Sequence, residues 1–271
     1  VTSIETNARA ATLTLSTGQK IEAVLCVAAD GRESPLRAQM GIRSTAWSYD
    51  QTAIVATIAH ERPHGGVAHE LFLPAGPFAI LPLIGNRSSI VWTERSAAAP
   101  AFLRLGGEDF LAEVSKRFGD QWGALSLEGP RFSYPLSLQL AADYVAERFV
   151  LAGDSAHGVH PIAGQGLNLG LRDVAALAET IVDAARLGQD LGSAPVLERY
   201  RRWRAFDNTA LAGVMDGLNR LFSNNLKPLR ALRTLGLGLV NEIGPLRRLF
   251  MRQAGGDMGD LPRLLRGSWT P

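Results

Sequence analysis

The stretch that decides the fold runs from Arg148 to Asp173 and reads RFVLAGDSAHGVHPIAGQGLNLGLRD. It opens with a short apolar run, which is typical of a buried strand and ends at Gly153 and Asp154. An acidic residue in that place lies at the carboxyl end of a strand, where open α/β sheets bind ligands. Its carboxylate can accept hydrogen bonds from the paired hydroxyls of a ribose. From Gly166 onward the apolar residues recur at helical spacing, so the pattern predicts strand, turn, loop and helix.

The start of that predicted helix is suited to an anion. Gly164, Gln165 and Gly166, followed by Leu167 and Asn168, form a first turn with little side chain on its backbone. The free N–H groups and the positive dipole end of a helix attract negative charge. A reduced flavin is such an anion, with its charge near N1 and the C2 oxygen, and a phosphate satisfies the same argument. Pro161 stiffens the loop before this helix.

A second motif, AADGRESPLR, occupies residues 28–37 and also follows an apolar strand. Asp30-Gly31 is a common turn dipeptide. Ser34 followed by Pro35 predicts the N-cap and first residue of a short helix, which would carry Arg37.

The two motifs together resemble those of the group A FAD-dependent aromatic hydroxylases. GDSAHGVHPIAGQGLNLGLRD is similar to the family's second flavin-binding motif, and residues 30–37 are similar to its Asp-Gly-x-x-Ser-x-x-Arg motif, which is associated with FAD and NAD(P)H. The resemblance implies that Asp154 holds the FAD ribose and that the loop from Pro161 to Asn168 lies along the isoalloxazine. The implied cofactor-binding residues are Asp30, Gly31, Ser34, Arg37, Gly153, Asp154, Pro161, Gly164, Gln165, Gly166, Leu167 and Asn168.

Within that family the chain is most similar to the ubiquinone-biosynthesis hydroxylases that act on polyprenyl phenols, and residues 69–83, HELFLPAGPFAILPL, resemble their substrate-domain strands. The resemblance implies a monooxygenase that uses FAD, NAD(P)H and O2 to hydroxylate the phenol ring through a flavin C4a-hydroperoxide. The motifs demand no general base, so they indicate no catalytic side chain. Two alternatives stay open: a flavin hydroxylase or reductase for another substrate, and a non-catalytic scaffold subunit of a quinone-biosynthesis complex.

One motif of the family is missing. A Gly-x-Gly-x-x-Gly turn after an N-terminal strand would cradle the FAD pyrophosphate. Gly164-Gln165-Gly166 lacks the third glycine, and Gly236-Leu237-Gly238 follows no strand. We therefore expect a chain truncated at its N-terminus by about 100 residues, which binds FAD poorly by itself. We also expect an exposed apolar face beside the strands at 22–28 and 148–152.

The predicted fold is a mixed α/β fold like that of para-hydroxybenzoate hydroxylase. Residues 1–43 and 141–187 would form the FAD-binding domain, with the Asp-Gly motif in the first part and the Gly-Asp motif in the second. Residues 44–140 would form an inserted antiparallel substrate sheet, and residues 188–271 a helical region. Local patterns predict a hairpin of 11–15 with 20–28, a helix at 108–118, a loop at 96–107 and a strand at 130–138.

Charge is uneven along the chain. The net charge is +2, with −5 on residues 1–185 and +7 on residues 186–271. In the basic part, apolar residues recur at helical spacing from Leu232 to Phe250, and Gly244-Pro245 would break the helix. This part is either a core-packing region with a solvated basic face or a surface that docks on an anionic membrane or partner. We expect a cytoplasmic protein, peripheral on the inner membrane.

Composition excludes several other classes. The single cysteine, Cys26, permits no intrachain disulfide, and no apolar run is long enough for an ordinary spanning helix. Nothing in the pattern suggests a nucleic-acid-binding motif. His157 and His160 lie in a loop without the further ligands of a tetrahedral site, so we expect packing or loop hydrogen bonds and no metal.

Overall fold

The structure is a computed structural model that describes the chain except residues 161–163, 223–237, 239, 241, 256–259 and 268–271. By contacts the chain divides into two units. The first holds Val1–Trp47, Leu138–Asp216 and Leu239–Pro271, and the second holds Ser48–Ser137 and Gly217–Gly238. Residues 188–271 are thus shared between the two units and form no unit of their own.

The first unit contains two small sheets. In one, β1 (Ser3–Thr6), β2 (Ala11–Thr14) and β3 (Lys20–Ala23) pair antiparallel. In the other, β10 (Val145–Ala146), β11 (Phe149–Leu151) and β4 (Cys26–Ala28) lie in that order, and β11 pairs parallel with β4. The single strand predicted at 20–28 was therefore wrong, because the chain leaves the hairpin after Ala23 and joins a different partner at Cys26.

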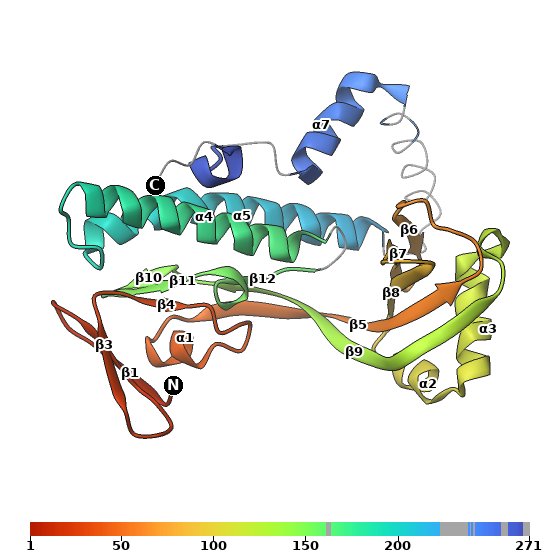
Figure 1. Cartoon of the computed structure of the whole chain (residues 1–271), viewed down its shortest axis with the longest axis horizontal. Helices are drawn as coiled ribbons and strands as arrows, with labels where there is room; N and C mark the ends of the chain where they lie inside the picture. The colour runs from red at the N-terminus through yellow and green to blue at the C-terminus, as the bar shows by residue number, and fades with distance from the viewer. Residues whose placement is uncertain (161–163, 223–237, 239, 241, 256–259, 268–271) are drawn as a thin grey trace. The chain divides into compact units, whose positions relative to one another are not determined.

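Helices complete the first unit. The short α1 (Pro35–Gln39) begins at the predicted Ser34 cap, and α4 (Gln165–Arg186) begins within one residue of the predicted start. The long α5 (Ala194–Phe222) lies beside α4 (Figure 1), to which a buried ion pair from Arg204 to Asp173 joins it. The unit also holds two 3₁₀ turns, η2 (Gly153–Ser155) and η4 (Arg263–Arg266), and the short β12 (His157–Gly158).

The C-terminal part of the chain contains a helix among its described residues. Helix α7 (Gly244–Gly255) begins where a break was predicted, because Pro245 occupies its first turn, where a missing N–H costs nothing. Leu232, Leu235 and Leu239 of the predicted apolar series lie outside the described residues. No helix within the described ranges combines the length and apolar character needed to cross a bilayer.

The second unit is built on antiparallel strands, as predicted. β5 (Ser44–His60), β6 (His69–Leu73), β7 (Gly76–Pro82), β8 (Arg87–Arg95) and β9 (Leu125–Ala141) belong to a sheet of order β12-β9-β5-β8-β7-β6. One face of β5, β7 and β8 buries its apolar residues with α3 (Gly107–Phe118), including Ile54, Ile80, Trp92 and Phe110. The helix predicted at 108–118 is confirmed.

One local prediction in this unit was wrong, and another gave a strand that is too short. The loop predicted at 96–107 contains α2 (Ala99–Arg104), whose first turn holds Pro100. A short 3₁₀ turn, η1 (Asp120–Trp122), follows α3. The strand predicted at 130–138 is the middle of a longer β9, because Gly129 and Pro130, which punctuate the sequence, do not interrupt the strand.

Helix α4 exposes an apolar stripe. Leu167, Leu171 and Val174 are 73%, 51% and 53% exposed, and their spacing places them on one side of the helix. Val24 and Val27, within the predicted segment 22–28, are also exposed. The side of α4 that packs instead carries Leu169, Asp173 and Ala176.

Candidate functional site

The parallel pairing of β4 and β11 brings together two motifs that are 124 positions apart. Leu151 lies beside Ala28 in the register, so both strands end at the same edge of the sheet. Asp30 follows β4 and Asp154 follows β11, and both side chains are exposed. Two carboxylates therefore stand at the carboxyl edge of neighbouring parallel strands, which is where α/β sheets bind ligands.

Buried hydrogen bonds fasten the two motifs to each other. The Ser155 hydroxyl, fully buried, donates to the Ala28 carbonyl at 2.6 Å. The guanidinium of Arg37 donates through Nη1 to the Ser155 carbonyl at 2.7 Å and through Nη2 to the Arg32 carbonyl at 2.9 Å. The bonds of Ser155 to Ala28 and of Arg37 to Ser155 link segments far apart in sequence, so they fix the relative position of the two turns.

The Asp-Gly motif uses several of its side chains within the protein. The Ser34 hydroxyl accepts a hydrogen bond from the Arg37 backbone N–H at 2.9 Å and so caps α1. The Asp30 carboxylate accepts one from the Leu36 N–H at 3.3 Å, and Gly31 has a φ of +86°. Ser34 and Arg37 are 1% and 8% exposed. Their assignment as FAD-binding residues stays a prediction, and their observed work is to shape this turn.

The Gly-Asp turn depends on two glycines. Gly153 has a φ of +67°, in the left-handed region that favours glycine. A Cβ on Gly170 of α4 would lie 3.4 Å from the Gly153 Cα, so the helix backbone approaches the turn closely. This approach leaves Asp154 as the exposed side chain of the turn.

The start of α4 has an open backbone. Gly164 precedes it with a φ of +62°, and within the described residues no side chain caps the first turn by a hydrogen bond. Gly164, Leu167 and Asn168 are exposed, whereas Gln165 is buried. Pro161 lies outside the described residues. The N–H groups at the start of a helix carry a partial positive charge, so this turn can receive an anionic ligand.

A buried polar cluster behind the turn was not singled out from the sequence. It consists of His157, Asp173, Arg204 and Asn208, each at most 1% exposed. Burial opposes ionisation of Asp173, but hydrogen bonds from His157 and Arg204 and their charges lower its pKa. The sequence did hold a signal for this cluster: Asp173 falls four residues after Leu169, on the side of α4 that is buried. His157, for which packing or loop hydrogen bonds were predicted, lies in β12 and bonds instead to Asp173 of α4.

A second missed residue is Arg32. Its guanidinium lies on Gly158, where a Cβ would come within 2.5 Å of Nε, and Nη2 donates to the Val159 carbonyl at 3.5 Å. Arg32 belongs to the Asp-Gly motif and Gly158 to the Gly-Asp motif, so this contact also joins the two. Among the described residues no group of three or more His, Cys, Asp or Glu side chains could hold a metal ion.

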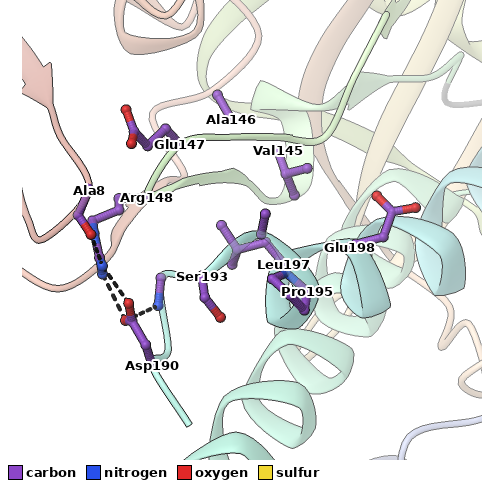
Figure 2. A pocket seen from close by; sticks show the side chains of 12 residues that line it. Ala8, Val145, Ala146, Glu147, Arg148, Asp190, Ser193, Pro195, Leu197 and Glu198 are labelled. Atoms are coloured by element: carbon purple, nitrogen blue, oxygen red, sulfur yellow. Dashed lines mark hydrogen bonds and ion pairs between the residues drawn. The ribbon is translucent and has the colours of Figure 1, made fainter.

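A cavity of about 770 Å³ lies away from these motifs. Figure 2 shows it between the chain from Val145 to Arg148 and the start of α5, and Asp190 forms an ion pair with Arg148 at its edge. Arg148 precedes β11 whereas Asp154 follows it, so the cavity lies at the amino end of that strand. The Arg148 guanidinium is occupied by Asp190 and by the carbonyls of Ala8 and Val24. The two motif turns therefore stay the predicted ligand site.

These residues fit a flavin dinucleotide. The Gly153–Asp154 turn offers an exposed carboxylate for ribose hydroxyls, and the open first turn of α4 offers N–H donors for an anionic ring. A family model described as an FAD binding domain matches residues 2–206. The chain therefore belongs to this family of FAD-binding domains, and its resemblance to the FAD-dependent aromatic hydroxylases is confirmed. The FAD prediction is confirmed with it.

Two curated proteins are similar to this chain over most of its length. The ubiquinone hydroxylase UbiL of Rhodospirillum rubrum is 54% identical over 257 residues, which cover 94% of this chain and 60% of that protein. The 3-demethoxyubiquinol 3-hydroxylase of Escherichia coli is 38% identical over 244 residues, which cover 90% and 62%. The chain thus spans about three fifths of the length of these curated relatives.

A solved structure supports the fold. The p-nitrophenol 4-monooxygenase PnpA from Pseudomonas putida matches with a TM-score of 0.74 at 18% identity, over 92% of this chain and 64% of that one. At that identity the match concerns the fold alone. The predicted class, a mixed α/β fold like that of para-hydroxybenzoate hydroxylase, is confirmed.

Proposed function

We propose that the protein is an FAD-dependent monooxygenase that hydroxylates the aromatic ring of a polyprenyl phenol in ubiquinone biosynthesis, with NAD(P)H as reductant. The observation that carries the proposal is the parallel pairing of β4 with β11, which sets Asp30 and Asp154 at one sheet edge. Two relatives named as hydroxylases of ubiquinone or its precursor support the substrate class.

In this proposal the chain's residues bind and orient, and FAD when bound supplies the electron transfer and oxygen chemistry. Asp154 accepts hydrogen bonds from the ribose hydroxyls. The first turn of α4, from Gly164 to Asn168, directs N–H donors at the negative charge of the reduced ring. The antiparallel sheet of the second unit provides the surface for the phenol. We further propose peripheral attachment to the cytoplasmic side of the inner membrane, where a polyprenyl substrate resides.

A genetic experiment tests this function. Deletion of the encoding gene should cause an unhydroxylated polyprenyl phenol to accumulate, detected by mass spectrometry of lipid extracts. The chromosomal substitution Asp154→Asn should cause the same accumulation while the protein remains present at its normal level. Normal quinone levels after deletion would refute the function.

The same experiment separates an enzyme from a scaffold. The second candidate is a non-catalytic scaffold subunit of a quinone-biosynthesis complex. A scaffold needs its partners and not its flavin, so Asp154→Asn would leave quinone synthesis intact while deletion abolished it.

The purified chain tests the cofactor site directly. Asp154 is exposed, and no described hydrogen bond uses its side chain. Asp154→Asn should therefore lower FAD affinity about tenfold, which is about 1.4 kcal/mol, without changing the melting temperature. Titration followed by flavin fluorescence measures the affinity. Because the sequence lacks the pyrophosphate turn, we expect weak binding by this chain, and a stoichiometric 450 nm flavin band after purification would contradict that expectation.

A further inference from the structure

The fully buried carboxylate of Asp173 accepts four hydrogen bonds from three directions. Its Oδ2 accepts from the Gly153 backbone N–H at 3.0 Å and from Nε2 of His157 at 2.5 Å. Its Oδ1 accepts from Nε of Arg204 at 2.8 Å and from Nδ2 of Asn208 at 3.0 Å. A single side chain of α4 therefore connects the Gly-Asp turn, β12 and α5.

A second layer holds these donors in place. Arg204 donates to the Asn208 side-chain oxygen at 2.7 Å and to the Asp207 carboxylate at 3.0 Å. The Tyr144 ring lies 6.4 Å from the His157 ring, measured between centroids. The Nδ1 of His157 is buried and has no hydrogen-bond partner within the described part of the chain. Nε2 of His157 therefore carries a proton, since it donates to the Asp173 carboxylate.

A buried ionic cluster of this kind adds little net stability. A buried ion pair replaced by well-packed apolar residues is often as stable, because both charges must leave water. The cluster instead fixes the positions of its members, because only one arrangement lets all four donors reach the same carboxylate. One of those donors is the N–H of Gly153, which precedes Asp154 directly.

We propose that Asp173 is a positioning residue for the flavin-binding turn: by holding the Gly153 N–H it sets the direction in which Asp154 meets the FAD ribose. The proposal rests on the proposed function for its ligand. It assigns Asp173 no contact with FAD, since that carboxylate is fully buried and all its oxygen positions are used. Arg204 and Asn208 act through Asp173 in the same way.

The test compares variants of the 271-residue chain. Asp173→Asn leaves one acceptor oxygen for four donors and an unpaired Arg204, so its melting temperature falls. The double variant Asp173→Asn with Arg204→Gln removes both charges together and restores charge balance. Asp190→Asn is the matched control, because it also strips a buried arginine, Arg148, of its carboxylate, but at the other end of β11.

Two measurements are made on each variant. Amide hydrogen exchange at Gly153, followed by NMR without ligand, reports whether the turn is held. Titration with FAD, followed by flavin fluorescence, reports affinity. We expect both Asp173 variants to exchange the Gly153 amide about tenfold faster and to bind FAD about tenfold more weakly. Asp190→Asn should lower the melting temperature and leave both readouts within about twofold of wild type.

Several results would overturn the proposal. One is a double variant that binds FAD as wild type does, because Asp173 would then serve stability alone. Another is an equal loss of affinity in Asp190→Asn, which would make the effect one of general destabilisation. Wild-type binding that neither Asp173 variant weakens would overturn only the positioning role. A wild-type chain with no measurable FAD binding would overturn the cofactor part of this proposal, whereas the proposed function is refuted separately, by normal quinone levels after deletion of the gene.

Discussion

Individual residues of the first unit show how closely charge and burial are matched. Arg204 and Arg148 are 1% and 5% exposed, and each has a carboxylate partner, Asp173 or Asp190.

The residues predicted from the motifs fall into two groups, one exposed and one buried. Asp154 is exposed and free to meet a ligand, whereas Ser34 and Arg37 are buried and shape the turn. A motif read from sequence does not separate these two kinds of work.

His160 gives a prediction about acid stability. Burial lowers its pKa from 6.5 to about 4, although the charge of Asp216 opposes the shift. In the unfolded chain His160 becomes protonated as the pH falls below 6.5. In the folded chain it stays neutral until about pH 4. Stability is therefore fully present above pH 6.5 and falls with pH across that window, by about 3 kcal/mol.

Replacing the histidine should remove that contribution. In His160→Gln the unfolding free energy, measured by urea denaturation from pH 8 to pH 4, should fall less steeply below pH 6.5 than in wild type. The difference between the two proteins at pH 8 supplies the control, because the histidine is neutral there in both states. Parallel curves across the whole range would contradict the prediction.

At the scale of elements, close backbone approaches decide which glycines matter. A Cβ on Gly192 would overlap the Val24 carbonyl oxygen and lie 2.6 Å from Nη1 of Arg148. Gly192→Ala should therefore destabilise the chain by about 1–3 kcal/mol, since neither a backbone carbonyl nor a paired guanidinium can move freely. Thermal denaturation measures the change.

Gly213 in α5 provides the matched control for that substitution. It is exposed, and a Cβ there would meet nothing within 4 Å. Gly213→Ala should stabilise the helix by up to about 1 kcal/mol, because alanine loses less backbone freedom in a helix. A Gly192→Ala variant as stable as wild type would show that the approach of residue 192 to Val24 is looser than described.

At the scale of the whole molecule, the basic C-terminal part predicts attraction to anionic membranes. Residues 186–271 carry a net charge of +7, and Arg247, Arg248 and Arg252 are exposed on α7. The chain should co-sediment with vesicles containing anionic lipid more than with zwitterionic vesicles. Raising the salt to about 0.5 M should suppress this binding, because added ions screen surface charge.

A charge-removing variant sharpens the vesicle experiment. Arg247→Gln with Arg248→Gln and Arg252→Gln should weaken vesicle binding, whereas Arg87→Gln with Arg95→Gln, exposed arginines of β8, should not. Equal binding to neutral and anionic vesicles would contradict an electrostatic attachment. It would favour the other interpretation of the basic part, a core-packing region with a solvated face.

The sequence by itself determined the local elements and the class of protein. The α1 cap, the helix predicted at 108–118, the start of α4 and both flavin motifs depend on interactions between residues a few positions apart, which leave a period or a cap in the sequence. The same local reasoning failed where a strand changes partner, as between Ala23 and Cys26, because alternation does not say which strand lies alongside.

Only the tertiary structure decided which distant groups meet. The pairing of β4 with β11 places Asp30 and Asp154 at one edge, and α4 and α5 bring Arg204 and Asn208 to Asp173. These contacts join residues from 31 to 123 positions apart. Their energy comes from burial and from donors that converge on one acceptor, and neither has a short period that a sequence can display.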